Sequence, residues 1–277
     1  FMVPENKKVI EKFQKEVVEE EFWEAICSGV VEELYWVGGE PLMYDIHWRA
    51  MDRLAEDDTL KLVHLRYNSN LSRVRFGKHY LYDWLPQAKD WTMCASIDGT
   101  GDIGEYIRTG LDWEQWDKNF REGVALPGGN DKMLMDLTLT GPGMFDLKNF
   151  FDYALELDVK IETKRMFAFH PDIVMSAMAW PRHILNRIID ENLAYIKPRA
   201  TQKQQTLINE LENMKVTPNF EEQWPDQHEE SFFNGRGWQD KIAEIRPKEK
   251  LRIQDIYAKD SELFDWWMRI DRKHNQR

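Results

Sequence analysis

The sequence predicts an α/β fold that continues into a mainly helical extension. Five apolar, β-rich runs alternate with helical patterns, at residues 32–37, 61–67, 91–97, 133–139 and 159–169, and no such run follows residue 170. Alternation of this kind is typical of a parallel sheet with right-handed crossovers. Because helices cover both faces of such a sheet, we expect strands that are hydrophobic almost throughout.

The chain opens with an amphipathic helical pattern over residues 5–28. Apolar residues recur there at steps of three and four, from Val9 to Cys27, and Gly29 follows as a stop signal. We therefore expect a buried helix. Because a helix and not a strand comes first, we expect the sheet to have a further strand upstream of Phe1.

The second half of the chain has only helical patterns. They lie at residues 181–196, 201–214, 237–246 and 253–273, separated by a proline-containing loop around 218–225 and by glycines at 235 and 237. We predict two parts, an α/β core over residues 1–175 and a helical extension over 176–277.

Composition narrows the class of protein. The formal charge of −12 argues against a surface that binds nucleic acid or anionic membranes, and 42% hydrophobic residues suffice for a large core. No apolar run approaches the ~20 residues of a membrane span, and the N-terminus does not resemble a signal peptide, so we expect a cytoplasmic protein. Two cysteines, Cys27 and Cys94, are too few for a disulfide framework, and we expect both to be inert core thiols.

Short polar segments follow the predicted strands. They are Gly38-Gly39-Glu40-Pro41, Asn68-Ser69-Asn70, Ser96-Ile97-Asp98-Gly99 and the segment from Thr138 to Gly143. Because the carboxyl ends of parallel strands meet at one edge, we expect these groups to converge on a single concave mouth. Two bare glycines let a ligand approach the main chain, and the Glu40 carboxylate offers an acceptor to a cation. Each segment alone is also what ordinary turns and helix caps contain.

A further segment, Glu105-Tyr106-Ile107-Arg108-Thr109-Gly110, follows the third of these turns. Arg108 at this place has two possible roles. It can reach the mouth and hold a carboxylate through two parallel hydrogen bonds. It can equally pair with Glu105 or Asp112 on the surface, where it would contribute little.

Taken together, these motifs resemble those of the radical S-adenosylmethionine (radical SAM) enzymes, in order and in spacing. Two segments look most like the twitch-domain subgroup of this family, which is often seen in phage and environmental sequences. They are Leu65-Arg66-Tyr67-Asn68-Ser69-Asn70-Leu71-Ser72 and Gly104-Glu105-Tyr106-Ile107-Arg108. The resemblance covers residues 5 to about 170 and is thinner beyond. It implies a partial (β/α) barrel whose first strand is missing from this chain.

The resemblance also implies a cofactor and a site. Enzymes of this family cleave S-adenosylmethionine reductively at a [4Fe–4S] cluster, with an electron donor such as flavodoxin or ferredoxin, and often act on peptides. By this resemblance Gly38, Gly39, Glu40 and Pro41 receive the ammonium group of S-adenosylmethionine. Ser69, Asn70, Ser96 and Asp98 contact its ribose or carboxylate, and Arg108 clamps the carboxylate. A peptide or another small molecule is the expected substrate.

One departure from the family is large. The CxxxCxxC loop that holds the cluster is absent from the sequence, and Cys27 and Cys94 cannot replace it, because the cluster needs three thiolates on one loop. We expect the cluster ligands to lie outside this chain, and the chain alone to be inactive.

Two other functions remain open from the sequence. The first is a cluster-free, non-catalytic barrel that binds a peptide or another ligand. The second is an unrelated barrel enzyme that uses Glu40, Asp98, His64 and His170 as acids and bases. His64 lies within an apolar run and is expected to be a hydrogen-bonded core histidine.

Overall fold

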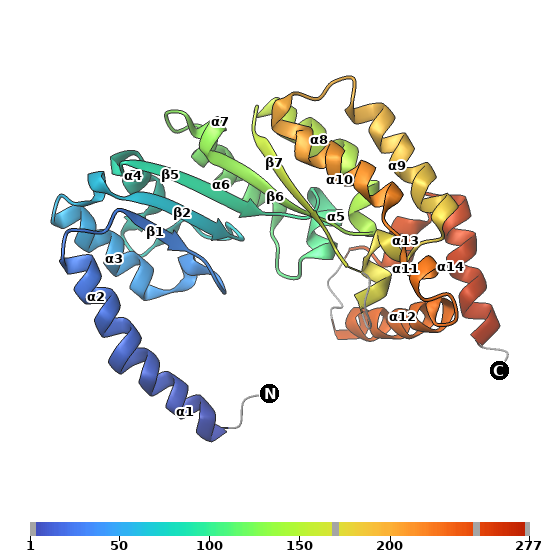
Figure 1. Ribbon diagram of the computed structural model, residues 1–277, viewed down its shortest axis with the longest axis horizontal. Helices are drawn as coiled ribbons and strands as arrows, with labels where there is room; N and C mark the ends of the chain where they lie inside the picture. Colours follow the sequence, from blue (N-terminus) through green and yellow to red (C-terminus); the bar gives the residue numbers. More distant parts are fainter. Residues whose placement is uncertain (1–3, 168–171, 246–249, 275–277) are drawn as a thin grey trace.

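A five-stranded parallel sheet forms the centre of the protein. The computed structural model describes residues 4–167, 172–245 and 250–274. The strands are β1 (Glu33–Trp36), β2 (His64–Ser69), β5 (Asp90–Ser96), β6 (Met133–Leu139) and β7 (Lys160–Arg165), in the spatial order β1-β2-β5-β6-β7 (Figure 1). Every neighbouring pair is parallel. The predictions of an α/β fold and of a parallel sheet are confirmed.

Helices connect the strands and cover one face of the sheet. They are α3 (Asp45–Glu56), α4 (Leu81–Trp84), α5 (Gly101–Ile107), α6 (Trp113–Val124), α7 (Gly129–Lys132) and α8 (Leu147–Glu156). His47 on α3 reaches Tyr67 on β2, with 3.0 Å between Nε2 and the hydroxyl oxygen. Gly123 on α6 lies directly against the sulfur of Met133 on β6. The short hairpin of β3 (Arg75–Phe76) and β4 (His79–Tyr80) was not predicted, because two-residue strands leave no periodic pattern.

The opposite face of the sheet is polar, and the prediction of strands buried on both sides was wrong. Along β6, Met133, Met135, Leu137 and Leu139 are buried, whereas the residues between them are only half-buried. Side chains of a strand point alternately to the two faces, so this pattern means that only one face is packed. On the other face Arg66 and Lys164 keep 49% and 57% of their side chains exposed.

The N-terminal helix is continuous but largely unburied. It comprises α1 (Pro4–Phe13), a π-helical stretch (Gln14–Val18) and α2 (Glu19–Cys27), and it extends away from the sheet (Figure 1). The helix over residues 5–28 is thus confirmed, whereas its burial was wrong, since Ile26 is the one buried residue of α2. The sequence period reveals which side of a helix is apolar, not what covers it.

Neither cysteine is a core residue, contrary to expectation. Cys27 is exposed at the end of α2, and Cys94 is half-buried on the polar face of β5. Partial burial raises the pKa of the Cys94 thiol, which keeps it protonated and weakly nucleophilic at neutral pH.

The extension consists of helices that gather beyond β7 (Figure 1). They are α9 (Arg182–Ile196), α10 (Gln205–Val216), α11 (Phe220–Gln223), α12 (His228–Ile245), α13 (Ile253–Tyr257) and α14 (Ser261–His274). The first two confirm the prediction, but α12 runs through Gly235 and Gly237, which were expected to break it. A glycine inside a helix destabilises it by only about 1 kcal/mol, and the buried Phe232 anchors α12. The division at residue 175 stays a prediction.

Within the described residues, every helix is too short or too polar to cross a membrane.

Candidate functional site

Glu40 connects the carboxyl ends of β1 and β2. Its Oε1 accepts hydrogen bonds from Ser69 Oγ (2.7 Å) and from the Leu42 amide (3.2 Å), and its Oε2 accepts one from the Asn70 amide (2.6 Å). Ser69 is 2% exposed and also accepts from the Leu71 amide, so its hydroxyl supports Glu40 and does not face solvent. A carboxylate offers about four acceptor positions, and three are used here. One position remains for a donor from outside.

The turn before Glu40 requires glycine for reasons of backbone geometry. Gly38 and Gly39 have φ angles of +88° and +53°, in the left-handed region. A Cβ on Gly39 would lie 2.8 Å from the Tyr44 hydroxyl oxygen, whereas a Cβ on Gly38 would meet open space. Pro41 follows as the first residue of a short helical turn capped by Glu40. The turn therefore holds the carboxylate in place while its own backbone stays uncovered at Gly38.

Asp98 and Arg108 form a second cluster at the end of β5. Arg108 Nε donates to Asp98 Oδ2 at 2.7 Å, and the Thr138 amide donates to Asp98 Oδ1 at 3.0 Å. The alternative pairing of Arg108 on the surface is wrong: Glu105 accepts from the Trp113 amide and Asp112 caps α6. Within the described residues the two terminal nitrogens of Arg108 have no hydrogen-bond partner, so they remain available to a ligand while Nε is held by Asp98.

The two clusters lie on the same edge of the sheet. Ser69 on β2 is in register with Ala95 on β5, so Ser69 and Asp98 are only a few residues apart across neighbouring strands. Neighbouring strands of a sheet are about 4.8 Å apart, so both clusters follow the carboxyl ends of adjacent strands. Glu40, Ser69 and Asn70 thus come together, and Asp98 and Arg108 come together separately, whereas a single mouth shared by all of these segments stays a prediction. Ser96 lies beside them and donates to Asp136 Oδ2 at 3.3 Å.

Asn70 uses its side chain locally. Its Oδ1 accepts from the Ser72 amide at 2.9 Å, which stabilises the turn after β2. The side-chain carbonyl of Asn70 therefore stabilises this turn, and its backbone N–H binds Glu40.

Asp146, which was not predicted as a site residue, supports the turn that contains Asp98. Asp146, 3% exposed, accepts from the amide of Thr100, from its hydroxyl (3.1 Å) and from Asn149 Nδ2 (2.9 Å). Burial is the main influence on its carboxyl group and raises its pKa. Because Asp146 is far from Thr100 along the chain, no local sequence pattern predicts this contact.

A close backbone contact holds α5, the helix that ends at Arg108, against the turn after β5. Gly104 on α5 packs against the turn after β5, where a Cβ on Gly104 would lie 2.2 Å from the Gly99 carbonyl oxygen. We expect Gly104→Ala to lower the free energy of unfolding by about 2 kcal/mol, because backbone atoms cannot move aside for a methyl group. Chemical denaturation measures this loss. Gly237→Ala is the matched control, since a Cβ there meets open space on α12 and is expected to leave stability unchanged or slightly higher. Equal stability of the two variants would contradict the expectation.

The polar face of the sheet borders this edge. Lys164 Nζ donates to both carboxylate oxygens of Asp136 at 2.7 Å, and Lys160 pairs with Glu162 on the same strand, β7. These side chains were not predicted as site residues. The alternation in Met133-Leu134-Met135-Asp136-Leu137-Thr138-Leu139 was the signal that could have identified this face.

The two histidines proposed as acids or bases do not join the site. His64 begins β2 and is in register with Asp90, at the opposite end of the strands from Glu40. Its Nε2 is buried without a hydrogen-bond partner among the described residues, so the expected hydrogen bond at that nitrogen is absent. His170 lies outside the described residues.

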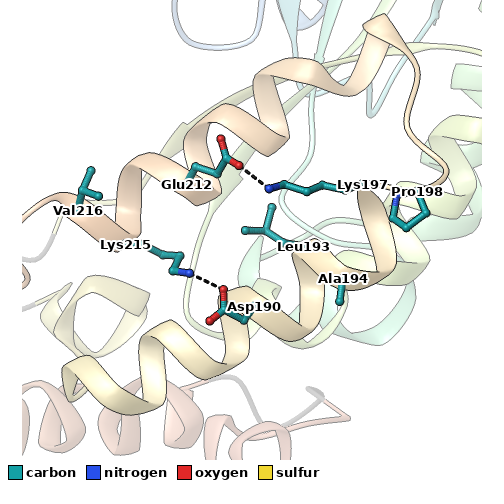
Figure 2. A pocket seen from close by; sticks show the side chains of 8 residues that line it. All are labelled: Asp190, Leu193, Ala194, Lys197, Pro198, Glu212, Lys215 and Val216. Atoms are coloured by element: carbon teal, nitrogen blue, oxygen red, sulfur yellow. Dashed lines mark hydrogen bonds and ion pairs between the residues drawn. The ribbon is translucent and has the colours of Figure 1, made fainter.

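A groove between α9 and α10 is unrelated to this edge (Figure 2). It has a volume of about 440 Å³. Two ion pairs span it, Lys215 with Asp190 and Lys197 with Glu212, each at 2.5 Å. Since its charged groups satisfy one another, the groove has no convergent free polar groups and carries no functional argument.

Potential metal ligands are not clustered in the part of the chain that the structure describes. Among the described residues, no group of three or more His, Cys, Asp or Glu side chains is arranged to hold a metal ion. The two cysteines lie on α2 and on the polar face of β5, and two thiols cannot supply the three ligands that a [4Fe–4S] cluster needs here. The residues of this chain therefore do not fit the cluster.

No family model and no curated protein matches the sequence.

Proposed function

We propose that this chain binds S-adenosylmethionine at the carboxyl ends of β1, β2 and β5 and is the cofactor-binding part of a radical SAM enzyme with a partial (β/α) barrel. One observation carries the proposal. Among the described residues, Glu40 has one unused acceptor position and Arg108 has an unpartnered guanidinium fork, on the same edge of a parallel sheet. Such a pair suits a ligand that carries an ammonium group and a carboxylate on one carbon atom, as an α-amino acid does.

The polarity of the site suits the methionine moiety in particular. Glu40 binds the ammonium, and the uncovered backbone at Gly38 lets that group approach. Arg108 binds the carboxylate in two places, while Asp98 keeps the guanidinium oriented and partly neutralised. The [4Fe–4S] cluster would supply the electron that cleaves the cofactor, and its ligands must come from outside this chain.

The polar face provides a place for a substrate next to the cofactor. Ser96, Asp136 and Lys164 lie on this face, which is partly open to solvent. A groove of about 320 Å³ at the end of β7 adds apolar surface, including Phe167 and Trp224, which are 66% and 51% exposed. The polar face and the groove with its exposed aromatic residues together favour a peptide substrate over a purely polar small molecule.

The test is cofactor binding by the isolated chain. Equilibrium dialysis with labelled S-adenosylmethionine is expected to show one saturable site, from which methionine displaces the label because it carries the same two charged groups. Binding that methionine does not displace, or no saturable binding up to millimolar concentration, would overturn the proposal.

Arg108→Lys tests the carboxylate clamp. Lysine keeps the charge but loses both the fork and the fixed Nε contact with Asp98, so affinity is expected to fall roughly tenfold. Arg121→Lys is the matched control, because Arg121 pairs with Asp117 and Glu156 on the outer side of α6. It should bind like the wild type. Equal affinities of the two variants would remove Arg108 from the site.

A cluster-free binding module remains the second candidate, and the absence of a three-cysteine set in this chain favours it. The reading frame upstream of Phe1 separates the two. An in-frame CxxxCxxC within a few dozen residues supports the radical enzyme, and a stop codon there supports the module.

A further inference from the structure

A small basic pocket lies between residues 72–75, which lead into the β3–β4 hairpin, and helix α6. Its volume is about 230 Å³, and three of the residues that line it are cations, Arg73, Arg75 and Lys118. Among the described residues of its lining, Glu122 is the one acid. Three cations against one carboxylate leave an excess of two positive charges, in a chain whose formal charge is −12.

Neighbouring carboxylates do not neutralise these cations. In the part of the chain that the structure describes, none of the three forms an ion pair, and Glu114, one turn before Lys118 on α6, does not reach it. Residues 67–82 contain no Asp or Glu. Glu122 accepts a hydrogen bond from the Tyr80 hydroxyl at 2.7 Å, so it holds that ring in place. Like charges held together repel one another, and an anion between them removes the repulsion.

Aromatic rings of the hairpin hold the two arginines. Arg75 is in register with Tyr80, and its Cζ lies 3.5 Å from the centre of that ring. Arg73 lies over Phe76, with 5.9 Å between Cζ and the ring centre. A guanidinium stacked on a ring keeps the N–H groups in its plane available, and it loses less freedom when a ligand binds. Both guanidiniums are therefore partly ordered before any ligand arrives.

A buried asparagine fixes the two walls of the pocket relative to each other. Asn119 on α6 is 2% exposed, and its Nδ2 donates to the Leu71 carbonyl oxygen at 2.8 Å. Its Oδ1 accepts from Gln115 Nε2 at 2.9 Å. This contact ties the helix that carries the lysine to the segment that carries the arginines. The three cations thus keep their separation without a ligand.

We propose that this pocket binds a phosphate group, either as free inorganic phosphate or as the phosphate end of a small ester. A phosphate monoester carries a charge of about −1.5 to −2 at pH 7, which matches the excess charge of the lining. Guanidinium forks fit phosphate oxygens in pairs, and lysine adds a point charge. Pockets that enclose a drug-sized ligand measure roughly 300–1,000 Å³, so this smaller one fits the phosphate and leaves the rest of the ligand outside. S-adenosylmethionine carries no phosphate, so the proposal is independent of the cofactor-binding function.

Isothermal titration calorimetry of the whole chain with inorganic phosphate and with glycerol 3-phosphate tests the pocket. At low salt, at least one of the two is expected to bind at a single site with a Kd of about 1 mM or lower. Tighter binding of glycerol 3-phosphate identifies an ester as the ligand, and equal or tighter binding of inorganic phosphate identifies the free ion. No saturable binding of either probe up to about 10 mM would overturn the proposal.

Two double variants separate the pocket from the overall charge. Arg73→Gln with Arg75→Gln is expected to weaken binding at least about tenfold, because both guanidinium forks are lost. Arg49→Gln with Arg53→Gln is the matched control: it removes the same charge from α3, where each arginine pairs with an aspartate, at 2.7 and 2.6 Å. It should bind like the wild type. Equal losses in the two double variants would overturn the assignment to this pocket.

Lys118→Gln tests the same pocket without altering the hairpin. The side chain is exposed on α6, so the fold should be retained, and circular dichroism verifies this. Binding is expected to weaken about threefold, because one of three cations is removed. Unchanged affinity in this variant would contradict the pocket as described.

A short single-stranded DNA in the same titration distinguishes a pocket from a nucleic-acid surface. The negative charge of the chain opposes a long polyanion, so DNA is expected to bind no more tightly than the better of the two phosphate probes. DNA binding at least about tenfold tighter, and lost in Arg73→Gln with Arg75→Gln, would overturn the small ligand in favour of nucleic acid.

Discussion

Replacing Glu40 with glutamine is expected to weaken binding of S-adenosylmethionine about a hundredfold, which corresponds to about 2.7 kcal/mol. Two losses combine. The ammonium group loses a charged acceptor, and hydrogen bonds to charged groups contribute about 1.5–3 kcal/mol. The glutamine amide also places an NH₂ group opposite either the Ser69 hydroxyl, which must then rotate to accept, or the Asn70 backbone amide, which can only donate, so the hydrogen bonds that hold the turn are weakened.

Glu33→Gln is the matched control for this experiment. Glu33 is the first residue of β1, whereas Glu40 follows the end of that strand, and Glu33 pairs with Arg66 at 3.0 Å and is half exposed. Its substitution should change cofactor affinity by less than about twofold, since surface ion pairs contribute little. Dialysis at a temperature below the melting transition of both variants gives the comparison. If Glu40→Gln binds as tightly as Glu33→Gln, the ammonium role of Glu40 is wrong and the carboxylate only stabilises the turn.

The parts of the fold that were predictable are those that local pattern determines. Residues 133–139 were predicted as a strand and form β6 with the same bounds, because a short, mostly apolar segment in which only Asp136 and Thr138 are polar has few alternatives to a strand. The parallel sheet followed from the alternation of strands and helices. The exposure of Phe13 did not follow, because it depends on what lies next to the helix in space.

The site was predictable to the same extent. That Glu40 and Asn70 meet follows from the rule that parallel strands share one carboxyl edge. The partner of Arg108 did not follow, since it depends on how α5 packs against the preceding turn through Gly99 and Gly104. Long-range contacts of this kind leave no signal within a short stretch of sequence.

The structure also bears on the alternative of an acid-base enzyme. His64 was a candidate base, but it lies at the amino end of its strand, away from Asp98. The acid-base enzyme therefore loses one of its proposed residues, and another, Asp98, is held in an ion pair with Arg108. An ion pair in place of a free base suits binding more than proton transfer.

Acidification below pH 6.5 is expected to destabilise the protein through His47. The imidazole is fully buried between the rings of Trp36, Trp48 and Tyr67, and burial lowers its pKa from 6.5 to about 3. Above pH 6.5 the histidine is neutral in both states and has no effect. Below it, the unfolded chain binds a proton that the folded chain does not, so the free energy of unfolding falls by up to about 1.4 kcal/mol per pH unit.

Urea denaturation at pH 7.5 and pH 5 measures this dependence above the range where most carboxylates titrate. The wild type is expected to lose about 2 kcal/mol from His47 between the two values. His47→Gln stays neutral and can still bond to the Tyr67 hydroxyl, so most of this difference should disappear even if the variant is less stable at both values. His183→Gln, on a side chain that is 70% exposed, should keep the wild-type difference. An unchanged difference in His47→Gln would mean that another group senses the acid, since the buried imidazole is the feature of the folded state that the substitution removes.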